Sequence, residues 1–316
     1  MSQQSKKAAV ARLSVLSNTL LVFGKLAVGL VTGSVSVLSE AIHSGVDLLA
    51  AAIAFFAVRE SGRPEDEQHA FGHGKVENLS ALAEALLIFV AAGWIVYEAI
   101  HKLLEPSPLD AAWAGMLVMG VSSAVNVYVS ARLFAVARET ESSALEADAW
   151  HLRTDVYTSV GVMAGLGLVW LAELLMPSRS VTWLDPVVAI IVACFIVRAA
   201  WHLSRDAIRD LMDTQLPQSE LDAIAECLES VHGPLYAYHG LKTRRAGSTR
   251  FVELHLEVPN TLSVEQAHQV ADEVEASIQK RLRSVSVTTH VEPVTLPPGP
   301  SSEADDPRTK NAAQDA

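Results

Sequence analysis

Two apolar segments of this sequence each carry a histidine followed four residues later by an aspartate. The first pair is His43 and Asp47, and the second is His151 and Asp155. Residues four apart on a helix lie on one face, with Cβ atoms about 5–6 Å apart, so each segment can present an imidazole beside a carboxylate. If the two faces meet, the four side chains form the tetrahedral N2O2 set that suits zinc or a similar cation. Their two carboxylates would balance one divalent charge.

A single pair of this spacing has a simpler explanation, which is a hydrogen-bonded pair on a helix surface. Ionisable side chains inside a membrane are costly, however, and usually face a pathway or a partner. Two copies within apolar segments therefore predict one shared metal site. We expect Asp148 to lie beside the ligands or at the entrance, where it can orient the imidazole of His151, and Glu40 is a further candidate for such a position. Snorkelling and hydrogen bonds between helices explain the other polar residues, Lys25, Asn18 and Asn126.

A second cluster lies in the charged loop that follows the second apolar segment. Asp66, His69 and His73 are three and four residues apart, and Gly72 and Gly74 permit a tight turn there. Three ligands can therefore converge on one ion. A solvated polar loop is the alternative, and the spacing does not decide between the two.

A third group of metal-binding residue types is spread over the last third of the chain. Its members are His239, His255, His268, His290 and Glu292. His290 and Glu292 share one face of a predicted strand, because strand side chains alternate between faces. Scattered surface histidines usually bind nothing, so spacing alone favours ordinary surface residues over a metal cluster.

Helices that cross a membrane have to position the paired ligands. Half of the 316 residues are hydrophobic and the mean hydropathy is +0.26, which is more apolar than ordinary soluble domains. A spanning helix needs about 20 mostly apolar residues. Six segments qualify, at residues 9–32, 36–58, 79–103, 112–136, 145–174 and 182–204.

The basic residues of the short loops predict the orientation, because cytoplasmic loops carry an excess of lysine and arginine. One side of the six-span arrangement has Lys6, Lys7, Arg12, Arg59, Arg63, Lys75, Arg132, Arg138, Arg205 and Arg209, and the other has only Lys102 and Arg179. Both termini should be cytoplasmic. The net charge of −12 comes with no basic patch, so we expect no binding to nucleic acid.

The residues after the last span predict a small α+β domain with the order αββαβ. Residues 219–231 are amphipathic, 235–244 and 250–258 alternate as strands, 263–282 form a helix capped by Ser263, and 285–291 form a third strand. We expect both helices on one face of the sheet. The predicted parts are a cytoplasmic N-terminus (1–8), a transmembrane domain (9–205), a cytoplasmic metal-binding domain (206–295) and a disordered tail (296–316).

With these motifs in place, the sequence resembles the cation diffusion facilitator family of dimeric divalent-metal exporters. The matching motifs are Ser39-Glu40-Ala41 with His43-Ser44 and Asp47, then residues 69–75 with Glu77, and Ala147-Asp148 with His151 and Asp155. The resemblance extends from about residue 8 to Val294. Several motifs occur in the family's order, which makes the resemblance specific.

The resemblance implies a role for each group of residues. His43, Asp47, His151 and Asp155 match the family's transport site; Asp66, His69 and His73 match a loop site; His239, His255, His268, His290 and Glu292 match a two-metal cytoplasmic cluster; Lys75 and Asp213 match a salt bridge near the membrane surface. Bacterial zinc exporters of the family often carry aspartate in place of Glu292 and of His43. The histidine at position 43 resembles zinc-selective members and argues against manganese.

These residues predict a secondary active transporter, not an enzyme. We expect proton-coupled export of zinc, or of Cd²⁺, Co²⁺, Ni²⁺ or Fe²⁺, by alternating access, in a homodimer of a bacterial inner membrane that is regulated by metal at the cytoplasmic domain. Protons compete with metal for imidazole near neutral pH. A membrane-bound metal sensor or scaffold is the main alternative. An intramembrane hydrolase is a weaker one, because four protein ligands leave zinc no open position and the sequence has no HExxH motif.

Overall fold

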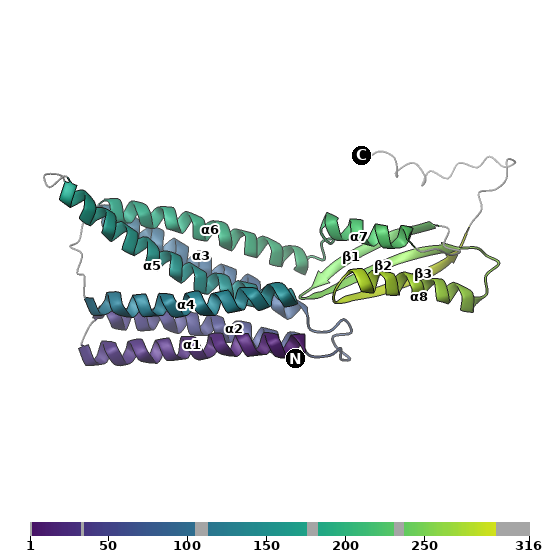
Figure 1. Cartoon of the computed structure of the whole chain (residues 1–316), viewed down its shortest axis with the longest axis horizontal. Coiled ribbons are helices and arrows are strands. Elements are labelled where there is room, and N and C mark those ends of the chain that lie inside the picture. The colour runs from purple at the N-terminus through teal and green to yellow at the C-terminus, as the bar shows by residue number, and fades with distance from the viewer. Residues whose placement is uncertain (1, 33–34, 105–112, 176–182, 231–236, 295–316) are drawn as a thin grey trace. The chain divides into compact units, whose positions relative to one another are not determined.

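The computed structural model describes residues 2–32, 35–104, 113–175, 183–230 and 237–294 (Figure 1). These residues fold into two compact units. The first comprises residues 1–216 together with the hairpin tip at 243–251, and the second comprises the described parts of 217–242 and 252–316. The predicted domain boundary at residue 205 falls inside the sixth helix, which continues to Leu211.

The first unit contains the six predicted long helices. They are α1 (Gln3–Thr32), α2 (Val35–Ser61), α3 (Lys75–Leu104), α4 (Trp113–Thr140), α5 (Ser143–Leu175) and α6 (Leu184–Leu211). Within the described residues, all except α5 are long and apolar enough to cross a membrane. The first half of α5 carries the charged residues Glu146, Asp148, Arg153 and Asp155. These residues make this half less apolar than the other helices, because it bears the ionisable groups of the candidate site.

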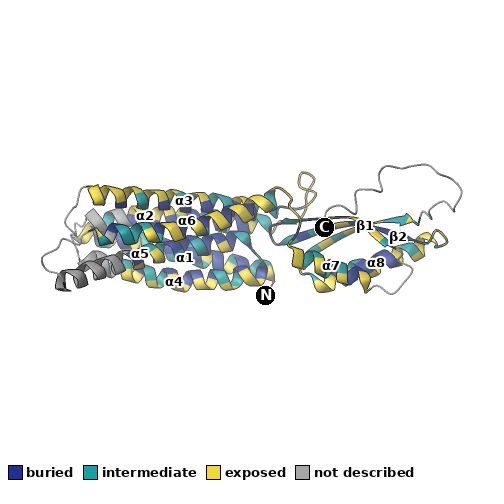
Figure 2. Ribbon diagram, turned by 90° about the horizontal axis from the view of Figure 1, so that it is seen from above, coloured by how far each residue is buried: buried dark blue, intermediate teal, exposed yellow. Residues whose placement is uncertain are grey.

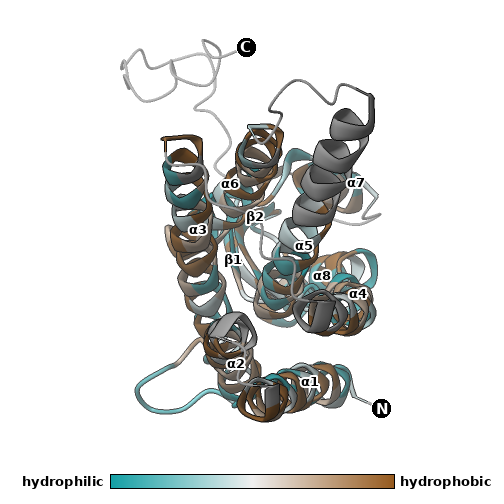
Figure 3. Cartoon of the chain, turned by 90° about the vertical axis from the view of Figure 1, so that its left-hand side faces the viewer, coloured by the Kyte–Doolittle hydropathy of each residue, from teal (hydrophilic) through white to brown (hydrophobic). Residues whose placement is uncertain are grey.

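The six helices pack in a ring in the order α1, α2, α3, α6, α5 and α4, and α4 returns to α1 (Figure 3). Small residues let the helices approach closely: a Cβ added at Gly161 would lie 2.8 Å from Val192 Cγ2, and many of the buried side chains are alanines. Large apolar side chains such as Phe23, Phe56 and Phe195 are exposed, as a lipid-facing surface requires. Inside the ring, α2 contacts α5.

The second unit confirms the predicted αββαβ order. Its elements are α7 (Gln218–Glu229), β1 (Ala237–Ala246), β2 (Thr249–Val258), α8 (Val264–Arg281) and β3 (Val285–Pro293), with the strands in the order β1-β2-β3. Both helices cover one face of the sheet (Figure 2), and α7 packs on α8. Ser263 and Gln266 form a capping box at the start of α8, which confirms the predicted cap.

The tip of the β1–β2 hairpin belongs to the helical unit. The Gly247 amide donates a hydrogen bond of 2.7 Å to Asn78 Oδ1 on α3. Gly247 has a φ of +58°, which a residue with a side chain rarely adopts. At Gly74 an added Cβ would lie 2.5 Å from the Ala246 carbonyl oxygen. The glycines of the loop and of the tip therefore permit this close backbone approach.

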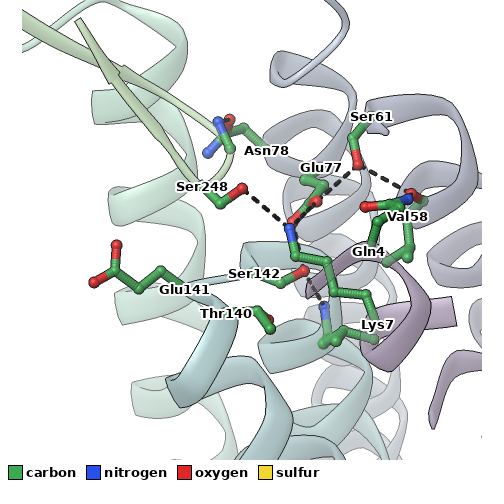
Figure 4. Close-up of polar contacts among 12 residues, drawn as sticks. Gln4, Lys7, Val58, Ser61, Glu77, Asn78, Thr140, Glu141, Ser142 and Ser248 are labelled. Carbon is green, nitrogen blue, oxygen red and sulfur yellow. Dashed lines mark hydrogen bonds and ion pairs between the residues drawn. The ribbon is translucent and has the colours of Figure 1, made fainter. Parts of the chain in front are cut away.

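A buried ion pair at the starts of α1 and α3 holds several elements together (Figure 4). Lys7 Nζ lies 2.8 Å from Glu77 Oε1, and the two side chains are 4% and 1% exposed. Glu77 also accepts hydrogen bonds from Ser61 on α2, at 2.7 Å, and from Ser142 in the α4–α5 turn. Lys7 donates a second bond, of 3.1 Å, to Ser248 at the hairpin tip. The Glu77 carboxylate on α3 thus connects α1, α2 and α3 with the α4–α5 turn.

Candidate metal sites

The two HxxxD pairs face each other where α2 contacts α5. His43 Nε2 lies 3.9 Å from Asp155 Oδ1, and His151 Nε2 lies 3.2 Å from Asp47 Oδ1. Each imidazole is therefore paired with the carboxylate of the other helix. Ligand atoms of His43, Asp47 and Asp155 all lie within 4.8 Å of one another. His151 is not in this group and reaches it through Asp47 alone. One imidazole and two carboxylates therefore converge here with a second imidazole beside them, and these donor types fit zinc.

The burial of this site is uneven. The side chains of Asp47 and His151 are 6% and 7% exposed, whereas those of Asp155 and His43 are 19% and 54% exposed in the single chain. An ion held by these four groups would therefore have a dry inner side and an open side next to His43. A site that exchanges its ion needs such an opening.

Around this site, Lys25 and Asn126 make the expected kind of hydrogen bond between helices, whereas Asp148 differs from the expectation. Lys25 does not snorkel: it is buried, and its Nζ donates a 2.8 Å hydrogen bond to Ser44 Oγ, next to His43. Asn126 of α4 donates to Asp155 Oδ2 at 3.4 Å, so it belongs to the site's surroundings. Asp148 has no hydrogen bond to His151, because both of its oxygens and His151 Nδ1 lack partners among the described residues. The side chain of Glu40 lies outside the described part.

The loop ligands also lie together. His69 Nδ1 and His73 Nε2 lie 3.0 and 3.3 Å from Asp66 Oδ1 and Oδ2, and the three residues form one group with ligand atoms within 4.8 Å. The His69 and Gln68 amides donate to Asp66 Oδ1 at 2.7 and 2.9 Å. These backbone bonds, led by that of His69, lower the pKa of the Asp66 carboxyl below its usual value. Asp66 therefore stays ionised, as a metal ligand must be.

A cation–π arrangement fixes the loop beside the hairpin tip. Arg244 stacks over Phe71 of the loop and over Phe251 of the hairpin, at 4.6 and 4.2 Å from the ring centroids. The two aromatic rings also meet edge to face. Both contacts stabilise the turn that brings His69 and His73 together.

The strands of the second unit bring three of the five predicted cytoplasmic ligands, His239, His255 and Glu292, into one group with ligand atoms within 4.8 Å, and His290 lies beside it. Glu292 Oε1 lies 2.8 Å from His255 Nδ1 and 3.5 Å from His290 Nε2, and its Oε2 lies 3.5 Å from His239 Nε2. The fifth, His268, is not in this group; it lies on α8, with Nε2 3.8 Å from Asp272. Imidazoles around one carboxylate fit zinc.

Sequence reasoning missed Glu257, which lies 3.3 Å from His239 Nδ1. Its carboxylate and Glu292 therefore lie at the two nitrogens of the same ring, an arrangement that fixes the orientation of a metal-binding imidazole. The signal was available, because Glu257 follows His255 by two residues in a strand and so shares its face.

The Lys75 and Asp213 pair predicted near the membrane surface lies within the helical unit. Lys75 Nζ is 2.9 Å from Asp213 Oδ1, and Arg244 Nη1 is 3.6 Å from the same oxygen. Asp213 has a φ of +54°, and its side chain is about half exposed. The pair therefore joins the start of α3 to the turn that follows α6.

Comparison with known proteins gives matches over both units. A family model for the cation efflux transmembrane domain matches residues 11–212, and one for the cation efflux protein cytoplasmic domain matches 216–294. The chain is 38% identical to the uncharacterized transporter sll1263 of Synechocystis, over 86% of each chain. It is 34% identical to the cation-efflux pump FieF of Pectobacterium carotovorum, over 84% of this chain and 86% of that one.

One solved structure, "Mode of Action of a Putative Zinc Transporter CzrB", is similar to a smaller part of the chain. It is 40% identical over 25% of this chain and 99% of its own, with a TM-score of 0.24.

Proposed function

We propose a cargo and a mechanism from one premise: this chain belongs to the cation efflux family of divalent-metal transporters. It is an integral membrane protein with a cytoplasmic domain, and it is a transporter and not an enzyme. Its cargo is zinc, bound by His43, Asp47, His151 and Asp155. The observation that carries this proposal is the convergence of imidazole and carboxylate atoms from α2 and α5, which is the donor set that zinc prefers.

Protons are the counter-ions in the proposed cycle. His151 Nε2 lies 3.2 Å from Asp47 Oδ1, so a proton can be shared between two atoms that are also candidate metal ligands. Metal binding needs neutral imidazole and ionised carboxylate. A proton arriving from outside therefore displaces zinc, and zinc arriving from the cytoplasm displaces the proton. Alternating exposure of the site to the two sides then couples inward proton movement to zinc export.

The choice among divalent ions depends on geometry and availability as well as on ligand type. Cd²⁺, Co²⁺, Ni²⁺ and Fe²⁺ accept the same donors and are alternative cargoes. The FieF and CzrB relatives are named for cation efflux and for zinc. A panel of these ions in the flux assay below gives the order of preference.

A flux assay distinguishes transport from binding alone. It measures the entry of zinc into proteoliposomes that hold a zinc-sensitive dye. The parent chain is expected to give saturable flux above that of protein-free vesicles. A metal-sensing scaffold would instead bind zinc tightly without moving it, and that result would reject the proposal.

For the loop site we expect His73→Ala to lower the zinc bound per chain by about one ion, because three ligands are the fewest that hold zinc firmly in a protein. Equilibrium dialysis of the purified chain measures the stoichiometry. The matched control is His202→Ala, which removes an exposed imidazole of α6. Equal stoichiometry in the parent and in His73→Ala would mean that the loop holds no ion.

The cytoplasmic cluster is proposed to regulate transport in a homodimer, a state that the dimer-type cytoplasmic domain supports. Zinc bound by His239, His255, His290 and Glu292 would draw the two cytoplasmic domains together and bias the helices. The distance between spin labels at Glu229→Cys in the two protomers, with Cys194 and Cys227 replaced by serine, reports this movement.

We expect zinc to shorten that distance in the parent chain and to leave it unchanged in the double variant His255→Ala/His290→Ala. His101→Ala serves as the histidine control. A zinc-dependent change that persists in the double variant would show that the sensor lies elsewhere.

A further inference from the structure

Two arginines lie against one aromatic ring where α4 packs on α5. The guanidinium carbons of Arg138, on α4, and Arg153, on α5, lie 6.0 and 5.9 Å from the centroid of the Phe134 ring. Trp150 of α5 packs edge to face on the same ring, with the two centroids 5.4 Å apart. Phe134 and Arg138 are one turn apart on α4, and so are Trp150 and Arg153 on α5, so each helix places a ring beside a cation. These four residues form the Phe134 cluster.

The Phe134 cluster reaches the outer surface of the helical unit. Arg138 is exposed, and the other three members are half-buried. Arg153 is two residues away from each of the candidate metal ligands His151 and Asp155. Two residues correspond to a turn of about 200° around the helix, so Arg153 lies on the side of α5 opposite to the metal site. The cluster is therefore a second polar feature of α5, separate from the metal ligands.

The cluster lies near the cytoplasmic end of these helices. Arg138 is in the last turn of α4, which ends at Thr140. The next residue, Glu141, lies 2.5 Å from Arg250, which belongs to the segment that matches the cytoplasmic domain. The N-terminus of α5 is at this same end, and helix side chains tilt toward the N-terminus, so the Arg153 side chain extends back toward the cytoplasm. The tryptophan of the cluster is a residue type that gathers at the headgroup level of a membrane.

The two arginines have no acidic partner. Neither forms an ion pair with Glu146 or with any other carboxylate among the described residues, and the nearby Glu139 and Glu141 bind other basic side chains. Because both guanidinium carbons lie about 6 Å from one ring centroid, they are at most about 12 Å apart. Two cations this close at the edge of an apolar medium repel each other. An anion bound between them would relieve that repulsion.

The surface next to the cluster indicates what kind of anion fits. Guanidinium groups match the oxygens of a phosphate in charge and in geometry. Farther from the cytoplasmic end, Val127 is seven residues from Phe134 on α4, and Val160 is seven residues from Arg153 on α5, so each valine shares a helix side with its cluster residue. They are 41% and 50% exposed. Basic groups with apolar side chains beneath them suit a phospholipid, whose phosphate is attached to acyl chains.

We propose that the Phe134 cluster binds the headgroup of one anionic phospholipid from the cytoplasmic leaflet. Arg138 and Arg153 contact the phosphate, the two aromatic rings hold the guanidinium groups in place, and the acyl chains lie along α4 and α5. A headgroup with a net negative charge is preferred, because the ammonium of a zwitterionic headgroup offsets the charge of its own phosphate. This inference is independent of the cargo and of the proton coupling proposed above.

The test measures which lipid the full chain retains. The purified protein is equilibrated in micelles that contain equal amounts of phosphatidylglycerol and phosphatidylcholine with identical acyl chains, then captured and washed, and the bound lipid is quantified by mass spectrometry. A basic residue near an anionic membrane surface strengthens attraction about fivefold. We therefore expect the parent to prefer phosphatidylglycerol roughly 25-fold, Arg138→Gln to lose about fivefold of this preference, and Arg138→Gln/Arg153→Gln to retain both lipids about equally.

The matched control is Arg132→Gln, which removes an exposed arginine of α4 outside the cluster. It should keep the preference of the parent within about twofold, because the site depends on the two arginines at the Phe134 ring. Equal losses in Arg132→Gln and Arg138→Gln would show a diffuse basic surface in place of a site, and so would overturn the inference. A parent chain that retains both lipids equally would overturn it as well.

A soluble anion is distinguished by adding inorganic phosphate in large excess before capture. The lipid should stay bound, because its acyl chains hold the headgroup at the protein surface. Displacement by phosphate would assign the cluster to a soluble anion and reject the lipid. If the double variant does not purify as a monodisperse protein, Arg138→Gln alone decides, because its side chain is exposed. An unchanged lipid preference in that variant would overturn the inference.

Discussion

Asp155→Asn is expected to lower the zinc affinity of the membrane site by about 100-fold or more. Asp155 supplies one of the two carboxylates that balance the divalent charge, and its oxygen lies within 4.8 Å of ligand atoms of His43 and Asp47. Asparagine keeps the shape and can still bond Asn126, but it removes the charge and a strong ligand. Loss of a residue that only hydrogen-bonds to a metal ligand lowers metal affinity about 10–100-fold. Loss of a ligand itself should lower the affinity at least as much.

Calorimetry measures this affinity best in a background in which the other sites are disabled by His73→Ala and His255→Ala. The matched control is Asp222→Asn, which removes an exposed aspartate of α7 that accepts a hydrogen bond from Gln218 of the same helix. Unchanged zinc affinity in Asp155→Asn would place the cargo site somewhere other than between α2 and α5.

Glu77→Ala is expected to be the most destabilising single change in the helical unit. It would leave Lys7 buried without its counter-charge and remove the acceptor of Ser61 and Ser142. Breaking a buried ion pair from one side costs about 3–5 kcal/mol. Thermal unfolding in detergent, followed by loss of the monodisperse peak, reports the change against the parent chain.

Two further variants test whether the loss of stability in Glu77→Ala comes from the buried, unpaired charge. Lys7→Met/Glu77→Met should be clearly more stable than Glu77→Ala, because replacing both partners of a buried pair by apolar side chains is often nearly neutral. Lys6→Ala breaks an ion pair with Glu139 whose side chains are 37% and 49% exposed, and it should cost under about 1 kcal/mol. Equal losses in Glu77→Ala and Lys6→Ala would show that the buried pair has no special role.

Much of the architecture follows from local patterns in the sequence. The long apolar segments, the capping residue Ser263 and the alternation in the last strands each depend on neighbouring residues, so they could be predicted. The HxxxD pairs could be found for the same reason, since a four-residue spacing is a local property. That α2 and α5 meet was an inference from chemistry, because two such pairs inside apolar segments predict one shared metal site.

The interactions that could not be predicted depend on residues far apart in the sequence. Glu77 looks like an ordinary acidic residue in the first turn of a helix, and its burial against Lys7 depends on the packing of α1 on its neighbours. Asp148 was expected to orient His151, but neither of its carboxylate oxygens has a hydrogen-bond partner among the described residues. Asn126 reaches Asp155 from α4, a contact that no spacing within one segment reveals.

Exchange of zinc for protons at the α2–α5 site is the central claim, and simultaneous recording of both ions tests it most directly. Proteoliposomes with zinc and pH dyes inside are given a zinc gradient and no imposed pH difference, with the parent chain and with Asp155→Asn. The account predicts that zinc entering the vesicles drives protons out in the parent, and that both movements vanish in the variant. Zinc flux in the parent without proton movement, or flux that survives in Asp155→Asn, would contradict it.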